Sequence, residues 1–145
     1  MLQHPFRFFY YFRSNLNFML NFFRNKNILK GVNYLDLTPF TINGFEEENG
    51  MVTILIKKFE SKIMQAFLPR NRTNFIKIHL DEPGSKVWLN IDGKKKVSDI
   101  IESISLTMGD KLPQTEQRVT KFLTQLFQQK FIGFKELSKP RHPKI

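Results

Sequence analysis

The chain of 145 residues contains no cysteine. This absence excludes thiol catalysis, iron–sulfur ligation by cysteine and a disulfide framework. It is consistent with a reducing compartment such as the cytoplasm. No apolar run reaches the roughly 18 residues that a membrane-spanning helix needs, so we expect no such helix. The length suits one domain rather than two.

Acidic residues are missing from both ends of the chain. Residues 1–30 carry five Lys or Arg, residues 138–145 carry three, and neither stretch contains Asp or Glu. Residues 31–137 hold fifteen Lys or Arg against thirteen Asp or Glu. The formal charge of +10 therefore belongs mainly to the ends. Because nucleic-acid binding needs a basic folded surface, the nearly neutral middle argues against a nucleic-acid partner.

No catalytic constellation is present. His4, His79 and His142 have no partner at the spacing of metal ligands, and no nucleophile elbow or paired-acid arrangement occurs. There is no glycine-rich phosphate loop with its lysine. The run Glu46–Glu48 has no nearby histidine and is interpreted as a solvated loop rather than a metal site. We expect neither an enzyme nor a bound cofactor or metal.

Residues 1–24 are unusually aromatic, with seven Phe and two Tyr. Helical spacing predicts an amphipathic helix. Three interpretations remain open: the helix packs on the body of its own protein, it docks on a partner or peripherally on a membrane, or the segment is a poorly ordered extension. The apolar stripe consists of Phe8, Phe12, Leu16, Met19 and Phe23.

Residues 31–50 are predicted to be a connector that contains a short extended piece, Tyr34–Pro39. Its acidic run, followed by Asn49-Gly50, is predicted to form a turn before the first strand, because both residues accept positive φ at low cost. Three strands in an antiparallel meander are then expected, at Met51–Phe59, Ile63–Leu68 and Phe75–Leu80.

The stretch Phe75–Gly93 organises the predicted domain. It begins as an alternating strand, the pattern typical of a half-buried strand. At Asp81 the pattern changes, because Asp is a good N-cap and Pro83 is tolerated in a first helical turn. Val87, Trp88 and Ile91 then follow at helical spacing, and Asp92-Gly93 ends the helix.

Two further helices are expected. Ser98 is predicted to cap the first, which Gly109 ends, and Thr115 is predicted to cap the second, which Gly133 ends. Phe134–Leu137 is expected to be extended. The apolar positions are Ile100, Ile101, Ile104 and Met108 in the first helix, and Val119, Phe122, Leu123, Leu126, Phe127 and Phe131 in the second.

The order of these elements predicts an α+β, winged-helix-like fold: a three-stranded antiparallel sheet followed by three helices, with an extra N-terminal amphipathic helix. The predicted organisation is a basic aromatic extension at 1–30, a connector at 31–50, the domain at 51–137 and a flexible basic tail at 138–145.

Two segments carry a resemblance to a known family. Ile78–Trp88, read as IHLDEPGSKVW, and Ile91–Ile100, read as IDGKKKVSDI, resemble the PqqD family, coenzyme pyrroloquinoline quinone synthesis protein D. The later Arg118–Ile132 is similar to its third helix. The resemblance spans roughly Met51–Leu137. Pro83 and the three lysines from Lys94 depart from the usual family pattern.

The resemblance implies a non-catalytic module that holds the leader of a ribosomally made precursor peptide. The leader would add as a strand beside the third strand and lie against the third helix, and a modifying enzyme, often of the radical S-adenosylmethionine type, would act on the peptide. From the residues themselves, we expect a cytoplasmic protein, with peripheral membrane contact through residues 1–24 as one alternative. The implied binding residues are Phe75, Ile76, Lys77, Ile78, His79, Leu80, Arg118, Lys121, Phe122 and Gln125.

Two rival functions also fit the pattern. A winged-helix nucleic-acid-binding protein would use the basic ends, and its affinity for DNA would depend strongly on salt. A structural adaptor would use the aromatic helix of residues 1–24 to dock on a membrane or on an enzyme. A search for a small peptide gene and a radical-enzyme gene nearby would discriminate between these classes.

Overall fold

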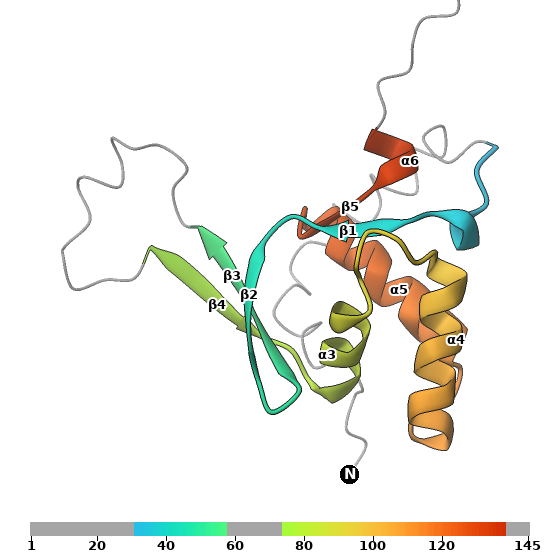
Figure 1. The fold of residues 1–145 in the computed structure, drawn as a ribbon, viewed down its shortest axis with the longest axis horizontal. Coiled ribbons are helices and arrows are strands. Elements are labelled where there is room, and N and C mark those ends of the chain that lie inside the picture. The colour runs from blue at the N-terminus through green and yellow to red at the C-terminus, as the bar shows by residue number, and fades with distance from the viewer. Residues whose placement is uncertain (1–30, 58–73, 139–145) are drawn as a thin grey trace, which may run out of the picture.

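The computed structural model describes residues 31–57 and 74–138. The expected N-terminal helix, the expected strand Ile63–Leu68 and most of the tail lie outside these residues. Figure 1 shows a twisted sheet on one side and the helices on the other. The elements are η2 (Tyr34–Asp36), β1 (Pro39–Thr41), β2 (Gly44–Glu48), β3 (Met51–Lys57), β4 (Phe75–His79), α3 (Glu82–Leu89), α4 (Val97–Met108), η3 (Gly109–Lys111), α5 (Thr115–Gln128), β5 (Ile132–Phe134) and α6 (Lys135–Ser138).

The predicted fold class is confirmed: the protein is α+β, with a three-stranded antiparallel sheet in the order β2-β3-β4, followed by helices. The membership of the sheet differs from the prediction. The acidic run Glu46–Glu48 is part of strand β2 and not of a loop. The Asn49-Gly50 turn forms as expected, with φ of 52° and 77°, but it joins β2 to β3 as a hairpin.

The predicted meander through Ile63–Leu68 is wrong in its pairing. Strand β3 pairs with β2 on one side and with β4 on the other, so both of its hydrogen-bonding edges are occupied. The described partners of β3 are thus β2 and β4, and residues 63–68 lie outside the described residues. The strand that the prediction missed is β2, which contains only one apolar side chain.

The two faces of the sheet differ in character. Because strand side chains alternate, the register places Phe45, Ile54 and Ile78 in one row across the inner face, which faces the helices. Ile54 is fully buried there. The outer face carries Thr53 and His79 in the adjacent row, and it also carries the apolar side chains of Met51, Leu55 and Phe75.

Helix α3 begins as the sequence predicts. The Asp81 side chain accepts a hydrogen bond from the Gly84 backbone N–H at 2.9 Å, as an N-cap does. Val87 and Trp88 are buried at 0% and 1% exposure and belong to the core between the sheet and the helices. The ring of Phe45 on β2 meets Trp88 edge to face, with centroids 6.0 Å apart.

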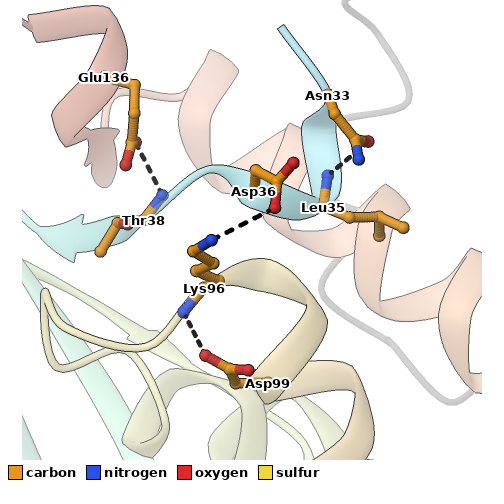
Figure 2. Close-up of polar contacts among 7 residues, drawn as sticks. All are labelled: Asn33, Leu35, Asp36, Thr38, Lys96, Asp99 and Glu136. Carbon is orange, nitrogen blue, oxygen red and sulfur yellow. Dashed lines mark hydrogen bonds and ion pairs between the residues drawn. The ribbon is translucent and has the colours of Figure 1, made fainter.

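The caps of the next two helices differ from the prediction. Helix α4 begins at Val97 after Lys96, whose backbone N–H donates to the Asp99 carboxylate at 2.9 Å, so Ser98 is not the cap. Helix α5 begins at Thr115 after Gln114, which has a φ of 56°. Figure 2 shows the contact of Lys96 with Asp99.

The end of α5 also differs from the prediction. The helix ends at Gln128, and Lys130 turns the chain with a φ of 61°. Gly133, the predicted helix stop, lies in β5, where Phe40 packs against it so closely that a Cβ would meet the Phe40 ring. The predicted extended piece Phe134–Leu137 is mostly the short helix α6.

The predicted connector is folded rather than open. Strand β1 pairs antiparallel with β5, and η2 takes the place of part of the expected extended piece. The Thr38 backbone N–H donates to Glu136 Oε2 at 2.8 Å, and Lys96 Nζ lies 3.4 Å from Asp36 Oδ1 (Figure 2). Leu37 between them is fully buried. The segment 33–41, which we term the clasp, therefore ties α4 to α6.

Candidate functional site

Strand β4 forms one edge of the three-stranded sheet. Its described partner is β3, and the order β2-β3-β4 leaves the other side of β4 unpaired by any described strand. Figure 1 shows this strand running along the border of the sheet before it joins α3. An unpaired edge presents a row of backbone N–H and C=O groups that can pair with another extended segment.

The register tells which backbone groups face outward. The Leu80 backbone N–H donates to the Val52 carbonyl oxygen at 2.9 Å. In an antiparallel ladder, residues bonded to the neighbouring strand alternate with residues that are not. Ile76 and Ile78 therefore direct their backbone groups to β3, whereas those of Phe75, Lys77 and His79 point to the open side.

A serine hydroxyl fixes the end of this ladder. The Val52 backbone N–H donates to Ser85 Oγ at 2.9 Å, and Ser85 Oγ lies 3.5 Å from the Leu80 carbonyl oxygen. The hydroxyl thus bridges the two strands where β4 passes into α3. Ser85 is fully buried and was missed as a positioning residue. The only signal in the sequence is its place in the first turn after Asp81.

Two side chains of β4 form polar contacts on the outer face of the sheet, one an ion pair and the other a hydrogen bond. Lys77 Nζ lies 3.0 Å from Glu46 Oε2 on β2. Thr53 Oγ1 lies 2.9 Å from His79 Nδ1. These contacts bridge the sheet and hold the edge residues in an extended geometry. Both are exposed, so each contributes little to stability.

The inner face of the same strand is apolar but incompletely covered. Leu80 is buried at 3% exposure, Ile78 is half-buried and Ile76 is 48% exposed. The exposure grows along the strand because helix α3 packs against β3 near the β4–α3 junction. An added strand on the edge would therefore find an apolar surface at Ile76 and Ile78.

The predicted helix residues do not all reach the surface. Phe122 is fully buried and lies next to the start of α3, where a Cβ on Gly84 would be 3.3 Å from its ring. Lys121 is exposed, and Arg118 and Gln125 are half-buried. Helix α5 packs mainly against α4 and β5. The structure thus assembles the strand residues into one edge and places Phe122 in the core.

The turn after α3 carries a perturbed carboxyl group. Asp92 Oδ1 accepts hydrogen bonds from the backbone N–H groups of Lys94 at 2.8 Å and Lys95 at 2.9 Å. The bond from Lys95 has the largest effect, and together these bonds lower the pKa of Asp92 from its ordinary value. A carboxylate that accepts backbone N–H groups favours its charged form. This turn is a structural feature outside the β4 edge.

Neither a metal centre nor a membrane span is found in residues 31–57 and 74–138. No group of three or more His, Asp or Glu side chains in these residues could hold a metal ion. None of the helices in the same ranges is both long and apolar enough to cross a bilayer.

One part of the chain matches a known protein family. A family model described as coenzyme PQQ synthesis protein D matches residues 73–132. Searches of curated proteins and of solved structures found no match. The matched segment contains the edge strand β4, all of α3, α4 and α5, and the first residue of β5. Over residues 73–132, the chain is therefore similar to the PqqD family, as its sequence motifs suggest.

Proposed function

We propose that this protein is a non-catalytic peptide-binding protein that holds the leader of a ribosomally made precursor peptide. It presents the peptide to a modifying enzyme, which we expect to be of the radical S-adenosylmethionine type. The leader adds as a strand to β4. The single observation that carries the proposal is the open side of β4 within the segment that matches the PqqD family.

Strand addition needs no special side chain on the protein. The backbone groups of Phe75, Lys77 and His79 supply the hydrogen bonds, and each such bond contributes about 0.5–1.5 kcal/mol net. A short ladder of this kind gives modest affinity by itself. Selectivity then depends on the side chains beside the edge, because alternate side chains of the added strand point to opposite faces.

The inner face favours an apolar residue in the leader. A leader side chain that points inward would lie next to Ile76, which is 48% exposed. Covering apolar surface stabilises a complex by about 25 cal/mol for each Å² removed from water. We therefore expect alternate apolar positions in the leader segment that binds.

Charge favours acidic positions in the leader. Lys77 already pairs with Glu46 at 3.0 Å, so its positive charge is partly compensated. Arg118 and Lys121 on α5 add positive charge on the helical side. A leader with acidic residues beyond the strand would be attracted to these side chains, and this attraction weakens with salt.

Leader binding can be tested by a backbone substitution at the edge. Because the Lys77 N–H points to the open side, Lys77→Pro removes one donor for the leader and leaves the ladder to β3 intact. We expect Lys77→Pro to weaken binding of the leader about tenfold or more, whereas Lys77→Ala retains most of it. The measurement is calorimetric titration of the full chain with leader peptides encoded beside its gene.

Two results would overturn the proposal. One is no saturable binding of any encoded leader to a chain whose circular dichroism shows that it is folded. The other is equal binding by Lys77→Pro and Lys77→Ala, because strand addition on this edge requires the Lys77 N–H. Thermal melts of both variants verify that each is folded.

A further inference from the structure

The charges of the three-stranded sheet are separated by strand. Its acidic residues, Glu46–Glu48, all belong to β2, whereas its two lysines, Lys57 and Lys77, belong to β3 and β4. The two lysines share the outer face, because Lys77 is opposite Leu55 and Lys57 lies two residues further along β3. Positive charge therefore lies toward β4, and negative charge lies along β2.

The sheet has a second edge that a peptide could join. The order β2-β3-β4 leaves one side of β2 unpaired by any described strand. Because Ile54 directs its backbone groups to β4, its neighbour Thr53 directs its own to β2, where it is opposite Glu46. The backbone groups of Phe45 and Glu47 therefore point to the open side of β2. Backbone pairing alone does not distinguish this edge from the edge of β4.

Strand β2 repels an acidic segment. In any register along Gly44–Glu48, an acidic side chain on an added strand would lie opposite one of the glutamates or diagonal to one. Like charges in such positions destabilise a sheet. Glu47 and Glu48 form no ion pair with any residue of 31–57 or 74–138, so no described cation offsets their repulsion.

The Lys77 side chain is closer to an added strand than to its present partner. Lys77 Nζ lies 3.0 Å from Glu46 Oε2, but Glu46 is on β2, two strand spacings or about 10 Å from β4. A residue opposite Lys77 on an added strand would have its Cβ atom only about 5 Å away. The side chains of Lys77 and Glu46 are 47% and 58% exposed, so their ion pair contributes little to stability. An acidic residue of the leader can therefore replace Glu46 as the partner of Lys77.

We propose that the leader segment on β4 has the pattern apolar–acidic–apolar, with the acidic residue opposite Lys77 and the apolar residues opposite Ile76 and Ile78. This inference rests on the proposed function and names the class of leader that the edge selects. Opposite residues of paired strands share a face, so the acidic residue lies on the outer face and both apolar residues lie on the inner face. The pattern is the same in either chain direction. The glutamates of β2 keep such a segment off the second edge.

A charge swap tests the acidic position. The probes are the encoded leader that binds the full chain and variants of it in which each Asp or Glu is changed singly to Lys. One variant, changed at an acidic residue between two apolar residues, should bind the unmodified chain about fivefold more weakly. Lys77→Glu should weaken binding of the unmodified leader by a similar factor and should restore binding of that one variant. Calorimetric titration measures all four combinations.

Two substitutions are matched controls for this swap. Lys57→Glu makes the same change of charge on the same face, but on β3, one strand further from the leader. It should change leader affinity by less than about twofold, because the longer distance through solvent screens the charge. Glu47→Pro is the counterpart of Lys77→Pro on the second edge, since it removes an outward N–H of β2 and leaves the ladder to β3 intact. It should also leave leader affinity within about twofold.

The outcomes separate this inference from the proposed function. Failure of every encoded leader to bind overturns both. Binding that Lys77→Pro weakens, with no acidic position whose effect depends on Lys77, overturns the charge pattern and leaves the proposed function standing. A coupled acidic residue without apolar neighbours has the same meaning. A loss of binding in Glu47→Pro as large as that in Lys77→Pro overturns the choice of β4 over β2. Thermal melts of all variants verify that each is folded.

Discussion

Tyr34 is the side chain whose ionisation the fold opposes most clearly. Its hydroxyl donates to the Thr120 carbonyl oxygen at 3.4 Å and accepts from Thr124 Oγ1 at 3.0 Å. Its ring meets Phe134 edge to face, with centroids 5.7 Å apart. Burial raises the pKa of Tyr34 from 10.0 to about 12, although the hydrogen bond from Thr124 acts in the opposite direction.

This pKa predicts a loss of stability at alkaline pH. Below pH 10 the Tyr34 hydroxyl is protonated in both the folded and the unfolded chain, so its contribution to the free energy of unfolding is fully present. Above pH 10 the unfolded chain ionises first, and the free energy of unfolding falls until the folded-state pKa of about 12 is reached. The loss is about 2–3 kcal/mol. Chemical denaturation at pH 8 to 12 measures it.

Tyr34→Phe is the matched control for this pH dependence. It keeps the ring and removes the titrating group, so its stability should fall less between pH 10 and 12 than that of the unmodified chain. A parallel decline in both proteins would show that other groups cause the alkaline loss.

Trp88 and Phe45 show what a sequence can reveal about a single residue. The spacing of Val87, Trp88 and Ile91 indicated a buried helical face, and all three side chains are buried. The partner of Trp88 on β2 could not be inferred, because Phe45 stands alone among polar residues in that strand. The edge-to-face contact exists only once the hairpin sets the register.

Among the elements, helix α5 divides sharply between an apolar and a polar face. Val119, Phe122, Leu123 and Leu126 are fully buried, as their spacing predicts. Lys121 is exposed on the other side. Phe122 was expected to contact the leader, but its ring lies beside Gly84 at the start of α3. Helical spacing identifies the buried face and cannot tell a core from a groove.

The two faces of α5 should respond differently to substitution. Phe122→Ala should lower the free energy of unfolding by about 3–5 kcal/mol, because it leaves a cavity between α5 and α3. Lys121→Ala should leave stability within about 0.5 kcal/mol, as exposed substitutions usually do. Urea denaturation of both variants provides the comparison. A Phe122→Ala protein as stable as the Lys121→Ala protein would contradict the core assignment.

Strand β2 illustrates why edge strands are hard to predict. All five of its residues, Gly44–Glu48, are exposed, so no alternation of buried and exposed positions marks it. The Asn-Gly turn after it was recognised, and that turn type is a strong hairpin signal. The pairing with β3 follows from the hairpin and not from the composition of β2. Polar edge strands also discourage unwanted pairing between molecules.

At the scale of the whole molecule, the clasp makes residues before β3 part of the domain. Leu37 is fully buried in the core, and its carbonyl oxygen accepts from the Val97 backbone N–H at 2.9 Å. The Lys135 backbone N–H donates to the Thr38 carbonyl oxygen at 3.0 Å. Residues 31–50 were expected to be a connector, whereas they supply part of the core and one strand of each sheet.

A truncation therefore tests the domain boundary. A chain of residues 51–145 lacks the clasp and β2. This truncation exposes the edge of β3 that pairs with β2, and it removes the Leu37 side chain from the core. We expect it to lose cooperative thermal unfolding, because burying one Leu side chain alone contributes about 2–5 kcal/mol. Near-ultraviolet circular dichroism of the packed Trp88 follows the transition.

The matched control for the truncation is a chain of residues 31–145, which keeps every described element. It should melt cooperatively. If residues 51–145 melted as cooperatively as residues 31–145, the clasp would be an accessory and the domain would begin at β3.

The distribution of charge over the molecule bears on the nucleic-acid alternative. The described residues carry a slight negative excess, and the basic residues concentrate in 1–30, 58–73 and 139–145. A nucleic-acid-binding fold places several Lys or Arg side chains on one folded surface. No observation on the described residues favours this function over peptide binding.

The sequence by itself determined the strand–helix junction at Asp81, the buried faces of the helices and the family resemblance. These features depend on neighbours within a few residues, through capping and helical spacing, and local patterns encode them. Tertiary structure alone decided that β2 and β4 flank β3, that Phe122 is core, and that the clasp closes the domain. Those features join residues far apart in the chain, and their free energy comes from contacts that form only when distant segments pack together.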